Sequence, residues 1–193
     1  MYEATVSLES ITPYSQSKGY LVPRLNDKEG HDEYQLRTWR ERCNYKNDGT
    51  IYIPRMAFKF CLVEAAKFLN MQIPGQGKKT YTKRFTSGID IMDDVLLAAN
   101  KETVEGESFS VPSDGVAGSG KRVTKIFPVI PEWKGTLRIF VFDELISQSA
   151  LERHIKEAGI FVGVGRFRPE KRGFYGRFRY TDIKYEEKGV FAV

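Results

Sequence analysis

The chain has 193 residues, of which 41% are hydrophobic and 28% charged, and its net charge is +5. This composition suits one soluble domain covering residues 1–193, and the lack of any run of about 18 apolar residues excludes a membrane-spanning helix. The start of the chain does not resemble a signal peptide, and Cys43 and Cys61 lack CxxC spacing. We therefore expect a cytoplasmic protein without a disulfide, metal or other cofactor.

The first half of the chain contains one strong strand signal and one strong helix signal. Residues 3–10 alternate in polarity with period two, which predicts a half-buried strand. Residues 12–50 are mostly polar and form the first expected insertion, with a short helix near residues 33–42. A short strand at residues 50–53 precedes a clear helix over residues 55–69, where apolar side chains recur every three or four positions.

Two further insertions interrupt the middle of the chain. Residues 71–86 are basic and contain glycines, and residues 100–122 are first acidic and then rich in glycine. Between them, residues 89–97 predict a strand. Two more strands are expected at residues 123–130 and 136–142.

The last third predicts a second helix and two final strands. Ser149 and Glu152 have capping-box spacing, and Gly159 is a natural end for the helix. Residues 160–168 and 174–185 read as strands. Without the insertions the order is strand, helix, strand, strand, helix, strand, which is the split βαβ or ferredoxin-like pattern of an α+β protein with an antiparallel sheet.

Positive charge is concentrated in three segments. Residues 78–84 carry +4, residues 121–125 carry +3, and residues 166–179 carry +5, so that the rest of the chain carries −7. Basic segments on an otherwise acidic chain favour local anion binding, although solvated basic loops are a simpler explanation.

The segment from residue 159 to 180 combines arginines, aromatic residues and glycines. Its alternation predicts a hairpin that turns at residues 169–173, with Phe167 and Phe178 in the core and arginines on the other face. Phe174 and Tyr175, near the turn, are then candidates for stacking on bases. In the simpler alternative, the arginines are only solvated.

Two other glycine-containing segments are candidate phosphate contacts. Residues 75–84, GQGKKTYTKR, suggest a flexible clamp with Tyr81, or else an exposed linker. Residues 115–121, GVAGSGK, match the start of a P-loop. Arg122 follows where Ser or Thr is needed, and a strand follows where a helix is needed, so we expect a basic loop without nucleotide hydrolysis.

Signals for catalysis are weak. His31 and His154 have no nucleophile motif beside them. Asp90, Asp93 and Asp94 leave a metal-dependent nuclease as an alternative, although a polar strand end explains them equally well.

Several segments resemble the RAMP superfamily, the proteins that build CRISPR effector complexes. The strand and helix IYIPRMAFKFCLVEAA, the loop TPYSQS at residues 12–17 and the late GVGRFRPEKRGFYGRF carry this resemblance. It implies a ferredoxin-like fold and RNA contacts through Lys59, residues 12–17, residues 78–84 and the late glycine loop. It also implies self-association along a guide RNA. The chain is also similar to small phage or prophage proteins.

We therefore expect a non-enzymatic protein that binds single-stranded nucleic acid, RNA in preference to DNA, as a homo-oligomer or within a larger ribonucleoprotein. A phage-encoded protein-interaction or assembly protein is the main alternative. The predicted nucleic-acid contacts are Lys59, Lys78, Lys79, Tyr81, Lys83, Arg84, Lys121, Arg122, Arg166, Arg168, Lys171, Arg172, Phe174, Tyr175, Arg177 and Arg179.

Overall fold

A four-stranded antiparallel sheet forms the centre of the protein. The computed structural model describes residues 1–113, 116, 118 and 120–189. The strand order is β4-β8-β1-β9, and the strands are β1 (Tyr2–Ser10), β4 (Ile89–Ile91), β8 (Lys134–Val141) and β9 (Phe178–Glu187). Neighbouring strands pair antiparallel throughout.

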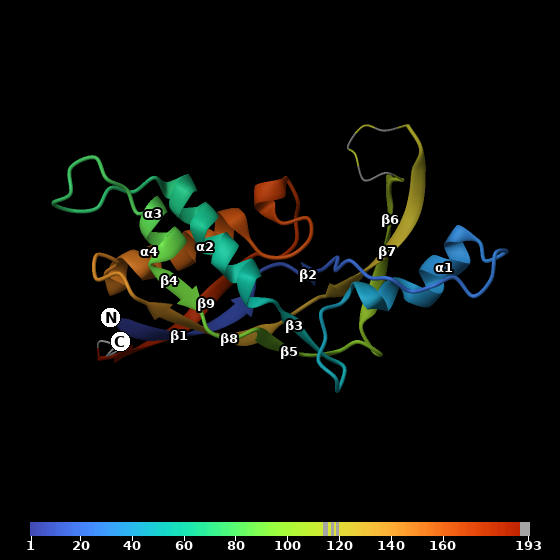
Figure 1. Cartoon of the computed structure of the whole chain (residues 1–193), viewed down its shortest axis with the longest axis horizontal. Helices are drawn as coiled ribbons and strands as arrows, with labels where there is room; N and C mark the ends of the chain where they lie inside the picture. The colour runs from blue at the N-terminus through green and yellow to red at the C-terminus, as the bar shows by residue number, and fades with distance from the viewer. Residues whose placement is uncertain (114–115, 117, 119, 190–193) are drawn as a thin grey trace.

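Three helices cover one face of this sheet (Figure 1). They are α2 (Arg55–Leu69), α3 (Thr82–Ser87) and α4 (Gln148–Glu157). Along the chain, β1, α2, β4, β8, α4 and β9 follow one another in the split βαβ order, which confirms the predicted ferredoxin-like α+β class. No helix in the described part of the chain is long and apolar enough to cross a bilayer.

Alternation in the strands decides which face of the sheet the helices cover. Ala4, Val6 and Leu8 of β1 are buried, and β8 places Leu137 and Ile139 beside them. A shift of one residue would turn these side chains toward solvent, so the apolar pattern fixes the register. The helices supply the other half of the core through Phe58, Leu62, Ala65, Leu151 and Ile155.

A second sheet extends beyond the central one as a two-stranded arm (Figure 1). The arm consists of β6 (Glu105–Pro112) and β7 (Arg122–Ile130), and β2 (Tyr14–Ser15) pairs with the base of β7. The insertion expected at residues 100–122 contains strand β6, which the sequence did not predict. Strand β6 is largely exposed, so it lacks the apolar alternation that marks a half-buried strand.

The predicted strand at residues 89–97 divides into two strands of different sheets. Strand β4 ends at Ile91, and β5 (Val95–Asn100) pairs instead with β3 (Thr50–Ile53). The break falls at residues 92–94. There Asp93 forms an ion pair with Arg138, and Asp94 forms one with Lys46.

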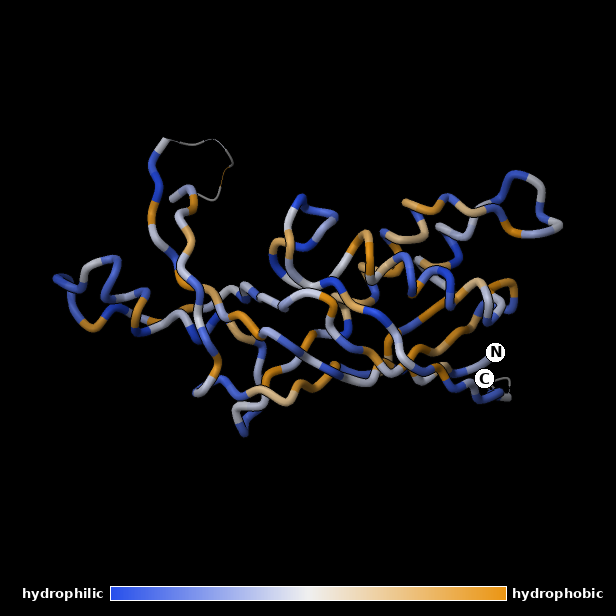
Figure 2. The backbone as a smooth tube through the Cα atoms, turned by 180° about the vertical axis from the view of Figure 1, so that it is seen from behind, coloured by the Kyte–Doolittle hydropathy of each residue, from blue (hydrophilic) through white to orange (hydrophobic). Residues whose placement is uncertain are grey.

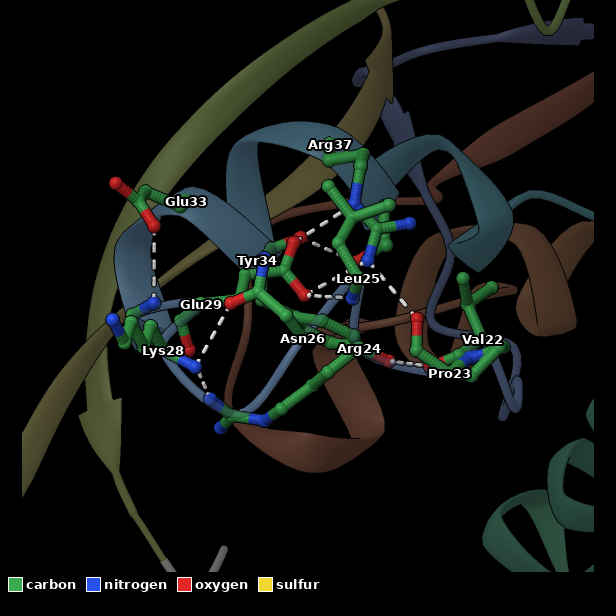
Figure 3. Close-up of polar contacts among 12 residues, drawn as sticks. Val22, Pro23, Arg24, Leu25, Asn26, Lys28, Glu29, Glu33, Tyr34 and Arg37 are labelled. Atoms are coloured by element: carbon green, nitrogen blue, oxygen red, sulfur yellow. Dashed lines mark hydrogen bonds and ion pairs between the residues drawn. The ribbon is translucent and has the colours of Figure 1, made fainter.

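Helix α1 (His31–Thr38) and the following 3-10 turn (Trp39–Arg42) confirm the predicted helix near residues 33–42. The segment before α1 folds back onto the helix, and residues 18–38 form a lobe beside the base of the arm (Figure 1). Figure 3 shows the polar contacts that hold this lobe together around Glu29.

The N-cap of the second helix lies two residues before the predicted Ser149, whereas its α-helical part ends at Glu157, next to the predicted end at Gly159. The N-cap is Ser147, whose Oγ accepts a hydrogen bond from the backbone nitrogen of Ala150 at 3.2 Å. After Glu157 the helix continues into a π-helical turn (Ala158–Val162) that ends at Gly163, which has a φ of 72°. Gly159 instead allows close packing, because a Cβ there would lie 2.1 Å from the carbonyl oxygen of Phe178.

Candidate nucleic-acid interface

The glycine loop, residues 163–177, is not the hairpin that the sequence predicts. A 3-10 turn (Pro169–Lys171) replaces the strand pairing, and β9 starts only at Phe178. Gly163, Gly165 and Gly176 have φ values of 72°, 84° and 78°. A Cβ on Gly176 would lie 1.8 Å from the carbonyl oxygen of Val164. The glycines therefore let the loop pack against itself, rather than let a ligand approach it.

The two predicted core anchors of this segment have different environments. Phe178 is buried and packs edge-on against Phe58, as expected. Phe167 has a φ of 49° and remains 43% exposed, so its assignment to the core was wrong. Because the backbone of Phe167 adopts a left-handed conformation, the strand alternation that predicts an inward-pointing side chain does not apply.

The two predicted stacking residues also differ. Phe174 is 58% exposed and is available to a base. Tyr175 is buried and its hydroxyl donates a hydrogen bond to Glu107 at 2.6 Å, so it is not free to stack. Burial and this hydrogen bond raise the pKa of Tyr175 to about 12.

Most arginines of the segment already have partners within the protein. Arg168 and Lys171 form ion pairs with Glu170 at 2.7 and 2.6 Å. Arg177 donates to the carbonyl oxygen of Ile160, and Arg179 pairs with Glu9. The guanidinium of Arg166 lies among phenylalanine rings. Arg172 is exposed and has no ion pair with any described residue, so it is the freest cation of the loop.

The basic segment at residues 71–86 is more ordered than predicted, because it contains most of helix α3. Tyr81 is buried against Phe85 and His154, so its assignment as a clamp was wrong. Arg84 pairs with Asp143 at 3.0 Å. In contrast, three lysines are exposed and form no ion pair within the described part of the chain. These are Lys78, Lys79 and Lys83.

The ammonium group of Lys59 is bonded within the protein. Its ammonium donates to the carbonyl oxygens of Phe85 and Ile89, and Asp90 is 3.9 Å away. Burial lowers the pKa of Lys59. The side chain ties α2 to the end of α3 and the start of β4, so the protein itself uses the charge that the family resemblance assigns to RNA.

The P-loop-like segment at residues 115–121 lies partly outside the described residues. A strand, β7, does follow it, as predicted. Lys121 is exposed, and Arg122 donates from Nε to the hydroxyl oxygen of Ser110 at 3.0 Å. Arg122 therefore braces the two strands of the arm at its outer end.

The three basic segments project to the same side of the molecule. The loop at residues 71–81, the glycine loop and the arm all rise from the side on which the helices lie, in Figure 1 and in the reverse view of Figure 2. On the opposite face of the sheet, Arg138 pairs with Glu3 and Asp93, and Arg179 pairs with Glu9. Lys134 and Lys184, on the same face, are exposed and form no ion pair with a described residue. The helical side carries the larger set of such cations, namely Lys78, Lys79, Lys83, Lys121 and Arg172.

The structure reveals exposed aromatic residues that the sequence analysis did not single out. Phe60 and Phe68 point outward from α2, and the ring of Phe161 stacks on Phe68 with centroids 5.2 Å apart. Cavities of 310 and 460 Å³ lie between α2 and the glycine loop. The sequence contains a signal for the exposure of Phe60 and Phe68, because both fall outside the apolar stripe of Phe58, Leu62 and Ala65 on α2.

The three carboxylates considered for a nuclease do not converge. Asp90 lies near Lys59, Asp93 pairs with Arg138, and Asp94 pairs with Lys46. Among the described residues no group of three or more His, Cys, Asp or Glu could hold a metal ion. Of the histidines, His31 contacts the carbonyl oxygen of Thr124, and His154 is buried against Phe85.

The architecture of this chain is similar to that of solved structures. No protein-family model and no curated protein matches the sequence. A chain from the cryo-EM structure of the Type III-B Cmr-beta bound to cognate target RNA has the same fold, with a TM-score of 0.56 and 11% identity over 95% of this chain. The chain therefore has the fold of that Cmr-beta chain. It spans 60% of the length of that Cmr-beta chain.

Two other solved structures are similar at lower TM-scores. Cmr6 from Pyrococcus furiosus is 15% identical, with a TM-score of 0.49 over 93% of this chain and 99% of its own. A chain of a CRISPR RNA-guided surveillance complex is 11% identical, with a TM-score of 0.40 over 97% of this chain and 72% of its own. The fold shared with the Cmr-beta chain agrees with the ferredoxin-like architecture that the sequence resemblance to the RAMP superfamily implies.

Proposed function

We propose that this protein is a non-enzymatic subunit that binds single-stranded nucleic acid, RNA in preference to DNA, along its helical side. The observation that carries the proposal is that the three basic segments rise on one side of the fold (Figure 1). Lys78, Lys79, Lys83, Lys121 and Arg172 are exposed there and form no ion pair with a described residue. Lysines and arginines free of carboxylates release counterions when they meet phosphates, which drives binding.

The aromatic residues of the same region favour single strands over duplexes. Phe60, Phe68 and Phe174 are each about 60% exposed. Unpaired bases stack on such rings, whereas bases within a duplex are already stacked on one another. The open face of the sheet has two exposed lysines without an ion pair among the described residues, Lys134 and Lys184. The helical side combines five such cations with the three exposed rings, so we assign the binding surface to it.

The similar Cmr-beta chain belongs to an assembly that is bound to target RNA. This supports RNA as the ligand and a ribonucleoprotein as the setting. We extend the proposal to self-association, in which further copies bind along the same strand. The expected cytoplasmic location remains a prediction.

Purification tests the proposal directly. A protein that carries RNA has a 260/280 nm absorbance ratio well above that of free protein, and its large species shrinks after ribonuclease treatment. A nucleic-acid-free protein that also fails to bind added oligonucleotides at low salt contradicts the proposal.

A protein-interaction role is the second candidate, because the lobe at residues 18–38 exposes large apolar side chains. Leu21 is fully exposed, and Leu25 and Leu36 are 71% and 65% exposed. Exposed apolar patches mark contact sites for other proteins. A pull-down that survives nuclease treatment and is lost on changing Leu21 and Leu25 to Ser supports this role; loss of the partner on nuclease treatment supports the nucleic-acid role alone.

A further inference from the structure

The arm meets the glycine loop at one side chain, Arg166. The centre of its guanidinium lies 3.4 Å from the ring centroid of Phe127 on β7 and 4.5 Å from that of Phe109 on β6. The ring of Phe167, in the glycine loop itself, is 3.8 Å away. One cation therefore contacts both strands of the arm and the loop that carries it.

Arg166 is held by these rings and not by an ion pair, although Glu107 is close enough to favour its charged form. The guanidinium forms no ion pair with a described residue, and its Nη1 is buried without a hydrogen-bond partner among them. Burial is the main reason that the pKa of Arg166 falls to about 10. Arg42 lies over the same Phe127 ring at 4.8 Å and adds repulsion. Cation–π contacts are strongest for desolvated cations, so the rings provide the attraction that holds Arg166 here.

Neighbouring contacts add to this junction between the arm and the glycine loop, which we call the joint. Phe109 packs edge-on against Phe167 and Tyr175, and the Tyr175 hydroxyl donates to Glu107 of β6. The backbone nitrogen of Arg166 donates to the carbonyl oxygen of Ser15 at 2.7 Å, and Ser15 pairs with Val129 of β7. The joint therefore fixes the base and the middle of the arm relative to the loop.

We propose that Arg166 is a positioning residue that clasps the β6–β7 arm to the glycine loop, and that it does not itself bind a phosphate. The inference rests on the proposed nucleic-acid function, because the clasp aligns the cations of the arm with Arg172 and the rest of the helical side. It reverses the role that the sequence predicts for Arg166. The side chain would have to leave three rings to reach a phosphate.

Hydrogen exchange of the free protein tests the clasp without any ligand. We expect Arg166→Gln to accelerate exchange of the amides of β6 and β7 about tenfold, which corresponds to the loss of about 1.4 kcal/mol, within the range of cation–π contacts. Phe109→Leu, which leaves every charge in place, should give the same pattern. Arg172→Gln is the matched control and should leave exchange in the arm unchanged. Unchanged exchange in both Arg166→Gln and Phe109→Leu would overturn the clasp.

Binding of single-stranded RNA over a salt series then separates positioning from phosphate contact. Arg166→Gln should weaken binding severalfold while the slope of log K against log salt stays that of the wild type. Arg172→Gln should reduce the slope by about 0.7, the contribution of one phosphate contact on a single strand. A reduced slope for Arg166→Gln would overturn the positioning role. If no variant and no wild-type protein bound RNA, the proposed function would fail, and the exchange experiment would still decide whether the clasp exists.

Discussion

Glu29 accepts two hydrogen bonds from the guanidinium of Arg37, at 2.8 Å from Nε and 3.0 Å from Nη2 (Figure 3). The same carboxylate accepts a hydrogen bond from the backbone nitrogen of Leu25, and Arg37 also donates one to the carbonyl oxygen of Pro23. The side chain of Glu29 is almost completely buried in the lobe. This pair therefore ties the irregular segment before α1 to the helix.

The pair predicts a pH dependence of the lobe. The hydrogen bond from Arg37 holds the pKa of Glu29 below its ordinary value of 4.5. A lowered pKa in the folded state means that the stabilisation is complete above about pH 4.5 and is lost as the pH falls through the lowered value. Protection factors of amides in residues 20–38 should therefore be constant above about pH 4.5 and fall progressively as the pH is lowered below it. Glu29→Gln should show low protection on both sides of this pH; an equal pH response in this variant would contradict the assignment.

The glycine loop predicts a second outcome. Gly176→Ala places a Cβ 1.8 Å from the carbonyl oxygen of Val164 at a φ of 78°, so it should lower the free energy of unfolding by roughly 2–4 kcal/mol. Gly19→Ala is the matched control, because nothing lies within 4 Å of its added Cβ and its φ is not positive. Denaturant unfolding measures both. Equal stability of the two variants would show that the loop does not need its glycines for packing.

The contrast between Phe174 and Tyr175 separates stacking from folding. Phe174→Ala should weaken binding of single-stranded RNA about tenfold, as expected for the loss of one stacked base, and change stability by less than about 0.5 kcal/mol. Tyr175→Phe removes the hydrogen bond to Glu107 and should act on stability first. Fluorescence anisotropy and thermal unfolding distinguish the two. Unchanged affinity of Phe174→Ala would remove Phe174 from the interface.

The location of free charge predicts a difference between two double variants. Lys78→Gln with Lys79→Gln should reduce the slope of log K against log salt by about 1.4, because each phosphate contact on a single strand contributes about 0.7. Lys134→Gln with Lys184→Gln removes the same charge from β8 and β9, where both lysines are exposed. That control should leave the slope unchanged. Equal slopes for the two pairs would place the nucleic acid elsewhere.

Local periodicity predicts the central fold well. The buried stripe of Phe58, Leu62 and Ala65 marks α2 over residues 55–69, and the alternation of Ala4, Val6 and Leu8 marks β1. Both elements have one buried face, so their sequences carry the period of their structure. Strand β6 has no such face and was missed for that reason.

The candidate site was harder to predict because its geometry depends on contacts between distant residues. The alternation around Phe167 looks like a strand, but Gly165 must pack against Tyr14 and Ser15, which turns the chain into a loop. Likewise, the partners of Arg166 and Tyr175 come from β6 and β7. A single sequence shows which residues are charged or aromatic, and not which of them already have partners.

Salt-dependent binding of a labelled single-stranded RNA tests the central claim most directly. We predict tight binding near 50 mM salt, weakening linearly in log K against log salt with a slope of about −2 or steeper, as three or more phosphate contacts require. A duplex of the same sequence should bind less tightly, because its bases cannot stack on the exposed rings. No binding at low salt, or a slope near zero, would contradict the account.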